Sequence, residues 1–178
     1  MKFLKLLAFG LFAVVGAARA ENLIVYFSET GNTERLATTV YENVGGDVAR
    51  IEPVSPYPVA YDERVEIALR EQAENARPKY NDLGVNVDDY DTVFLGYPVW
   101  LNGMPMIIYT FLEDNNFAGK TIIPFNTYGG EPFGNSIEEI KRLAPRATVT
   151  EGFALRGGET LQDHSESVKD WLRKIGKL

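Results

Sequence analysis

Apolar residues along the chain form short continuous runs that alternate with longer segments of helical spacing. The runs are rich in β-branched and aromatic side chains, which is typical of strands buried on both faces of a parallel sheet. They predict strands over residues 23–27, 47–51, 93–97, 121–125 and 148–155. Pro124 weakens the fourth strand, because proline cannot donate a hydrogen bond to a neighbouring strand.

Between these runs, apolar residues recur every three or four positions, which predicts helices. In chain order, the first helix is expected to end at Gly45 and the second to cover 62–75. The third is expected to begin at Pro105, and the fourth at the capping box of Ser136 and Glu139. The last is expected to end at Gly176. Five strands that alternate with five helices predict a single α/β domain, in which helices cover both faces of a doubly wound, mostly parallel sheet.

The first twenty residues have the pattern of a secretory signal peptide. Lys2 and Lys5 precede an apolar stretch over residues 6–15, and the small residues Ala18 and Ala20 fit a cleavage site. The stretch is shorter than the roughly 20 residues that span a bilayer, so a permanent anchor is the weaker alternative. We expect residues 1–20 to be a signal peptide, the mature domain to cover 21–178 without an integral membrane span, and the protein to be exported, into a bacterial periplasm.

Charge and composition exclude several classes of function. The chain has no cysteine and a single histidine, His164, which excludes disulfides, iron–sulfur clusters, thiolate zinc sites and multi-histidine metal sites. Without Lys2, Lys5 and Arg19, the chain has 15 basic and 25 acidic side chains, which gives a net charge of about −10. Such a chain repels nucleic acid and anionic lipid. A small ligand held by backbone groups, or a partner protein with a basic face, fits this charge better.

The loop after the first strand, Ser28-Glu29-Thr30-Gly31-Asn32-Thr33, places polar side chains directly before a helix. Backbone N–H groups at a helix start bind phosphate without a basic side chain, and Gly31 permits the positive φ that such a loop requires. A simple helix cap at Thr30 or Asn32 is the alternative. The glycine patterns of Walker and dinucleotide loops are absent here, and no aspartate ends the third strand as in a phospho-accepting receiver domain.

The loops after the third and fourth strands combine aromatic residues with glycines. Trp100 lies in the first of these loops, and Tyr128 precedes Gly129 and Gly130 in the second. In doubly wound sheets, ligands bind beyond the carboxyl ends of the strands. Aromatic side chains at that edge can cover a flat ring, although Trp100 packed beneath its own loop is the alternative.

Four segments, in order, resemble the flavodoxin family, and specifically its short bacterial flavodoxin-like branch. They are the loop 28–33, the stretch 90–100, the stretch 119–125, and Gly129-Gly130, within a resemblance that extends from about Leu23 to Leu178. The resemblance implies a flavodoxin-like FMN-binding domain with strand order 2-1-3-4-5. It implies phosphate binding by Ser28, Thr30, Gly31, Asn32 and Thr33, and ring binding by Pro98, Val99, Trp100, Asn102, Gly103, Thr127, Tyr128, Gly129 and Gly130.

In such a protein the cofactor FMN carries the chemistry, so no catalytic side chain is expected. The resemblance favours an electron carrier that serves a redox partner protein or a small electron acceptor. Two alternatives are an FMN-dependent NAD(P)H:quinone-type oxidoreductase and a flavin-binding module without redox function, because a fold does not fix a function. The signal peptide departs from a family that mostly works in the cytoplasm.

Overall fold

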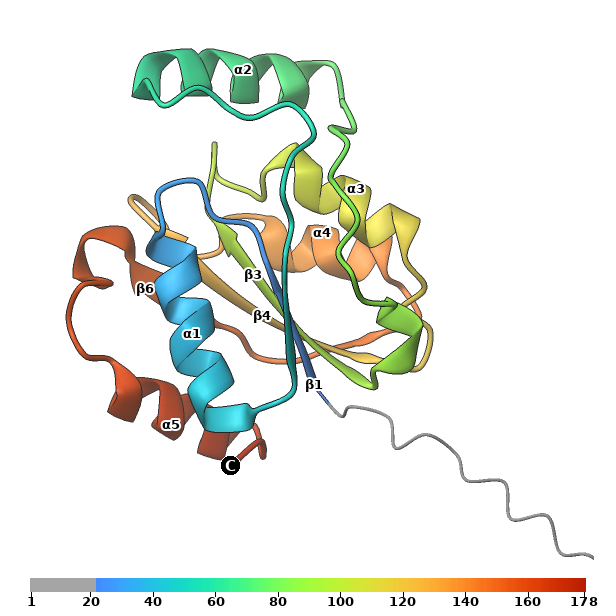
Figure 1. Cartoon of the computed structure of the whole chain (residues 1–178), viewed down its shortest axis with the longest axis vertical. Coiled ribbons are helices and arrows are strands. Elements are labelled where there is room, and N and C mark those ends of the chain that lie inside the picture. Colours follow the sequence, from blue (N-terminus) through green and yellow to red (C-terminus); the bar gives the residue numbers. More distant parts are fainter. Residues whose placement is uncertain (1–21) are drawn as a thin grey trace, which may run out of the picture.

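The computed structural model describes residues 22–178, and the predicted signal peptide lies outside them. Its sheet consists of β1 (Asn22–Tyr26), β2 (Asp47–Arg50), β3 (Thr92–Pro98), β4 (Thr121–Tyr128), β5 (Thr148–Val149) and β6 (Phe153–Arg156). The strand order is β2-β1-β3-β4-β5, β6 also pairs with β4, and all pairs are parallel (Figure 1). The predicted flavodoxin-like α/β sheet with order 2-1-3-4-5 is confirmed.

Helices cover both faces of this sheet. Those on one face are α1 (Asn32–Val44) and α5 (Ser165–Lys174), and those on the other are α3 (Met106–Asp114) and α4 (Ser136–Leu143). The remaining helix, α2 (Tyr61–Ala73), lies across the carboxyl ends of the strands, at the top of Figure 1. Two short 3-10 turns, η1 (Val87–Asp89) and η2 (Gly157–Glu159), complete the described elements.

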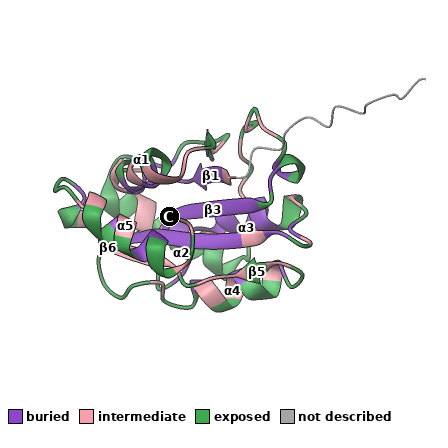
Figure 2. Cartoon of the chain, turned by 90° about the horizontal axis from the view of Figure 1, so that it is seen from below, coloured by how far each residue is buried: buried purple, intermediate pink, exposed green. Residues whose placement is uncertain are grey.

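The central strands pack against apolar side chains on both sides. Leu23 and Val25 of β1 belong to the cluster beneath α3 and α4, whereas Ile24 and Tyr26 belong to the cluster beneath α1 and α5. β1 and β3 are accordingly buried along almost their whole length (Figure 2). Burial of alternate side chains on opposite faces explains why these strands read as continuous apolar runs.

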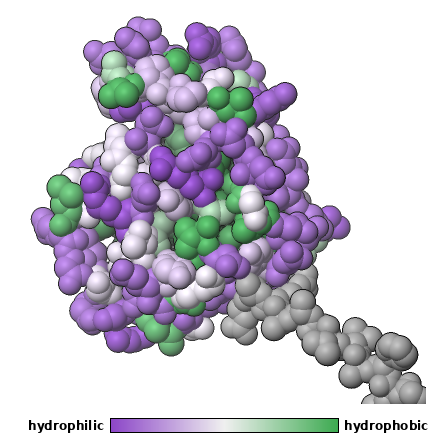
Figure 3. Space-filling model, viewed as in Figure 1, coloured by the Kyte–Doolittle hydropathy of each residue, from purple (hydrophilic) through white to green (hydrophobic). Residues whose placement is uncertain are grey.

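The outer surface is largely hydrophilic on the face that Figure 3 shows. Within residues 22–178, no helix has the length and apolar character needed to cross a bilayer.

The predicted fifth strand, 148–155, is interrupted in the structure. β5 and β6 both pair with β4, but one extra residue lies between them, because Val149 is opposite Ile122 while Phe153 is opposite Phe125. The interruption lies beside Pro124. The carbonyl of Ile122 accepts a hydrogen bond from Thr150 N–H, so the alternation of the strand turns Pro124 toward the same edge, where it has no N–H to donate.

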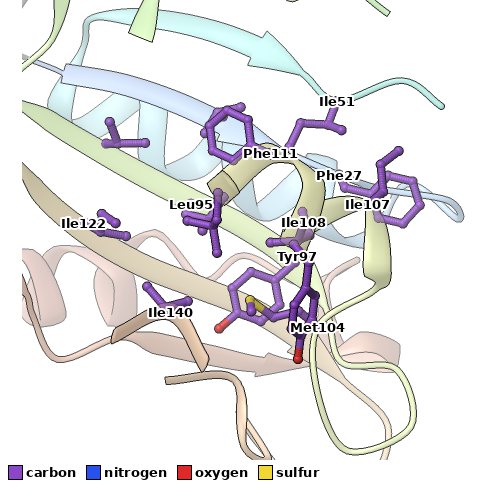
Figure 4. Close-up of a cluster of buried hydrophobic side chains, with 14 of the residues drawn as sticks. Phe27, Ile51, Leu95, Tyr97, Met104, Ile107, Ile108, Phe111, Ile122 and Ile140 are labelled. Atoms are coloured by element: carbon purple, nitrogen blue, oxygen red, sulfur yellow. The ribbon is translucent and has the colours of Figure 1, made fainter. Parts of the chain in front are cut away.

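The capping box predicted at Ser136 is wrong. Asn135 precedes the first turn of α4, and no side chain caps this described helix end. Ser136 is fully buried instead, and its hydroxyl donates to the Phe133 carbonyl at 2.6 Å and shares a 2.8 Å hydrogen bond with the hydroxyl of Tyr97. Tyr97 is part of the apolar cluster in Figure 4. Ser136 therefore connects β3 to α4.

We predict that Gly96→Ala destabilises the protein by about 1–3 kcal/mol, because overpacking of a tight core displaces its neighbours. A Cβ at this position would collide with the ring of Phe125 and the Cβ of Tyr26, and the Phe125 ring is fully buried. Urea unfolding of the ligand-free protein measures the effect. Gly130→Ala is the matched control, since open space surrounds that position. Equal unfolding free energies for the two variants would contradict the close packing at Gly96.

Candidate functional site

A pocket of about 700 Å³ opens at the carboxyl ends of the strands, where a doubly wound sheet is expected to bind its ligand. Its walls come from the loops after β1, β3, β4 and β6, together with α2. The sequence-predicted residues that line it are Ser28, Thr30, Asn32, Thr33, Pro98, Val99, Trp100, Thr127, Tyr128, Gly129 and Gly130. The fold thus brings the three predicted loops, after β1, β3 and β4, to one pocket although they are distant in sequence.

The loop after β1 leads directly into α1. Gly31 stands before the first residue of α1 with a φ of 81°, and no side chain in the described chain caps this helix end. The alternative of a simple helix cap is therefore wrong for Thr30 and Asn32. The first N–H groups of α1 carry partial positive charge and remain available to an anion.

Ser28 adds a second feature of the same loop. The side chain is buried and lines the pocket, yet its hydroxyl has no hydrogen-bond partner within residues 22–178. A buried hydroxyl without a partner costs free energy, and a ligand group that hydrogen-bonds to this atom would remove that cost.

A hydrogen bond joins the two sides of the pocket. The hydroxyls of Thr33, in the first turn of α1, and Thr127, near the end of β4, lie 2.9 Å apart and are buried. This contact fixes the loop after β1 relative to the loop after β4.

Trp100 lies at the wall of the pocket and also packs against the core, and its contact with a bound ring stays a prediction. Its ring lines the pocket and is partly buried against the core, with its centroid 5.5 Å from that of Phe27 and 5.1 Å from that of Tyr57. Both contacts are edge-on, at interplanar angles of 81° and 88°. This packing holds the indole in place at the wall of the pocket.

Three predicted site residues do not line the pocket. Gly31 contributes its backbone conformation to the loop. Asn102 and Gly103 form a tight turn, in which Trp100 and Gly103 exchange two 2.9 Å backbone hydrogen bonds and the Asn102 carbonyl accepts from Asn135 N–H. The turn shapes the loop that carries Trp100, and direct contact of Asn102 or Gly103 with a bound ring stays a prediction.

The sequence did not reveal that α2 and the loop after β6 contribute to the pocket. The additional lining residues are Glu29, Tyr61, Arg64, Val65, Ala68, Leu101, Arg156, Gly157 and Gly158. The sequence of α2 could have indicated its place at the pocket, because the segment has few large apolar residues that could face a core. Within this fully described helix only Ala68 is buried.

Two charged side chains of this set have defined surroundings. Glu29 lines the pocket, and burial raises the pKa of its carboxyl although the positive charges of Arg64 and Arg50 act in the opposite direction. The guanidinium of Arg156 lies 5.2 Å from the centroid of the Tyr128 ring and donates to the Gly129 carbonyl at 2.7 Å. Arg156 thereby supports the loop after β4.

A hydrogen bond attaches α2 to the rest of the molecule. Tyr57, buried against Phe27 and Trp100, donates its hydroxyl to Glu71 of α2 at 3.0 Å. Burial raises the pKa of the Glu71 carboxyl, and the hydrogen bond and Arg70 offset only part of that effect.

We predict that Glu71→Gln is more stable, relative to the wild type, at pH 7 than at pH 4. A raised pKa means that folding favours the protonated carboxyl, so this contribution to stability is present below about pH 4.5 and is lost as the pH rises through the folded-state pKa. Glutamine keeps an acceptor for Tyr57 without a charge. The gain should stay below about 1 kcal/mol because the side chain is partly exposed.

Urea unfolding of both proteins at the two pH values measures this difference. Glu66→Gln, at an exposed position of the same helix, is the control and should show no such change. If the unfolding free energy of the wild type increased relative to that of Glu71→Gln as the pH rises, this would contradict the raised pKa.

Comparison with known proteins gives consistent matches over almost the whole described chain. A family model for flavodoxins matches residues 21–175. A curated relative, the flavodoxin-like domain-containing protein BilS of Clostridioides difficile (strain CD3), is 25% identical over 160 residues, which cover 86% of this chain and 74% of the relative.

Solved structures agree with this assignment. A protein named as a flavoprotein from Bacteroides eggerthii is 34% identical, with a TM-score of 0.75, over 88% of this chain and 98% of its own. A flavoprotein of Lactobacillus acidophilus, solved in complex with FMN, has a TM-score of 0.63 at 19% identity, over 79% of this chain and 95% of its own. The second likeness supports the fold alone.

Proposed function

The chain belongs to the flavodoxin family, and from this premise we propose that its pocket binds FMN and that the protein transfers electrons. The observation that carries the proposal is the buried hydroxyl of Ser28, which lines the pocket without a partner among residues 22–178, beside an α1 N-terminus that no described side chain caps. Together they form a phosphate site.

The pocket residues fit both parts of this cofactor. Ser28, Thr30, Asn32 and Thr33, with the backbone N–H groups that follow Gly31, would hold the phosphate. The indole of Trp100 and the ring of Tyr128, on the loops after β3 and β4, would enclose the flavin with Pro98, Val99, Thr127, Gly129 and Gly130. FMN itself supplies one- and two-electron chemistry, and the chain positions it and sets its surroundings.

Electron transfer is the role that best matches the charge of the protein. A mature net charge of about −10 disfavours additional negative charge on a bound ring, which lowers its reduction potential. The same charge attracts a redox partner protein with a basic face, and a small electron acceptor could take its place.

We predict that the mature protein retains FMN with its visible absorbance bands, and that Ser28→Ala weakens FMN binding about tenfold through the loss of one hydrogen bond to a charged group. Titration of ligand-free protein with FMN measures the affinity, and Ser167→Ala, exposed on α5, is the matched control. Absence of flavin binding by the wild type would refute the cofactor assignment.

Redox titration then tests the role of an electron carrier. We expect at least one midpoint potential below that of free FMN. Potentials equal to those of the free cofactor would contradict this, and steady NAD(P)H oxidation in the presence of a quinone would favour the oxidoreductase instead.

We further propose that the protein is exported and works in a bacterial periplasm. Residues 1–20 carry the charge, apolar stretch and small residues of a signal peptide. The mature protein should be found in the periplasmic fraction with Glu21 at its N-terminus, as determined by mass spectrometry. Replacing both Ala18 and Ala20 with leucine should leave residues 1–20 attached. Full-length protein confined to the cytosol would contradict export.

A further inference from the structure

Arg64 reaches the pocket from α2, which is separate from the loop after β1, residues 28–33, called here the phosphate loop. Arg64, Ser28 and Glu29 all line the pocket, and the charge of Arg64 acts on the Glu29 carboxyl more strongly than that of Arg50 does. The Arg64 side chain donates from Nη1 to the carbonyls of Pro58 and Val59, at 3.2 and 3.3 Å. A guanidinium carries five N–H donors, so the group can also serve an anion.

A positive charge in the pocket would strengthen the binding of an anion to the phosphate loop. Glu29 places a carboxyl within the loop itself, and a phosphate brought next to it meets both this group and the negative charge of the whole protein. Arg50 does not line the pocket; its guanidinium donates to the Ser28 carbonyl at 3.1 Å and lies 3.7 Å from the Glu34 carboxylate and 3.8 Å from that of Glu52. Its charge is therefore shared with other carboxylates.

We infer that Arg64 binds the phosphate of FMN, so that α2 closes over the loop after β1 as a clamp. The inference rests on the proposed FMN binding and adds to it a ligand contact from an element outside the three loops. Arg64 then offsets Glu29 at the position where the charge of the phosphate is held.

The packing of α2 is consistent with a helix that the ligand helps to hold. Within α2, which the structure describes in full, Ala68 alone is buried, and Tyr61 is 71% exposed. The Tyr57–Glu71 hydrogen bond attaches the helix to the core near its C-terminal end. A phosphate contact at Arg64 adds a second attachment, near the start of the helix.

The test compares FMN with riboflavin, which has the same ring and chain but no phosphate. Affinities of both ligands are measured by flavin fluorescence for the wild type, Arg64→Gln, Arg64→Lys and the control Arg70→Gln, which is exposed on the same helix and does not line the pocket. Arg64→Gln should weaken FMN about tenfold and riboflavin less than about twofold. Arg64→Lys should recover part of the FMN affinity, and Arg70→Gln should change neither.

Removal of the opposing charge provides an independent readout. Glu29→Gln should tighten FMN binding and leave riboflavin binding unchanged, because FMN carries a phosphate that this carboxylate repels and riboflavin does not. Unfolding midpoints of the ligand-free variants identify any general loss of stability.

The outcomes separate the two proposals. If Arg64→Gln weakened the affinity for FMN and for riboflavin equally, or weakened neither, the role of Arg64 would be overturned while FMN binding stands. A wild type that binds FMN no more tightly than riboflavin would overturn the phosphate site as a whole, and with it the clamp.

Discussion

A parallel sheet that is buried on both faces leaves its side chains no access to solvent, so ligand chemistry can be placed only at the ends of its strands. In this chain the middle of β1 and β3 is fully apolar and buried. Hydroxyls, glycines and partly buried aromatic rings appear where the strands end and the loops begin. The positive end of α1 lies at the same edge, which makes that edge the favourable place for an anion.

The same constraint explains what the sequence could predict. Strands buried on both faces must be continuous apolar runs, so their positions, the α/β class and the loops that reach the ligand edge were readable. The polar residues of the loop 28–33 come directly before a helix, and this short-range arrangement predicts phosphate binding. Eleven of the fourteen residues singled out for the site line the pocket.

The differences all depend on contacts between distant parts of the chain. Ser136 has the spacing of a helix cap, but the hydroxyl of Tyr97, 39 residues away, lies within hydrogen-bond distance of its own. Pro124 affects the neighbouring edge strand rather than its own. The contribution of α2 depends on where the helix lies over the strand ends, and the charge of Arg64 acts on the Glu29 carboxyl only because of that position. A local sequence pattern does not reveal such contacts between distant residues.

The hydrogen bond between Thr33 and Thr127 has a consequence for the entropy of binding. It joins positions 94 residues apart, so the chain loses the freedom of that large loop when it folds. A ligand that touches both loops then enters a site whose two walls are already held together, and its own binding energy need not order them. Affinity in such a site is limited by the quality of its contacts rather than by the cost of assembling it.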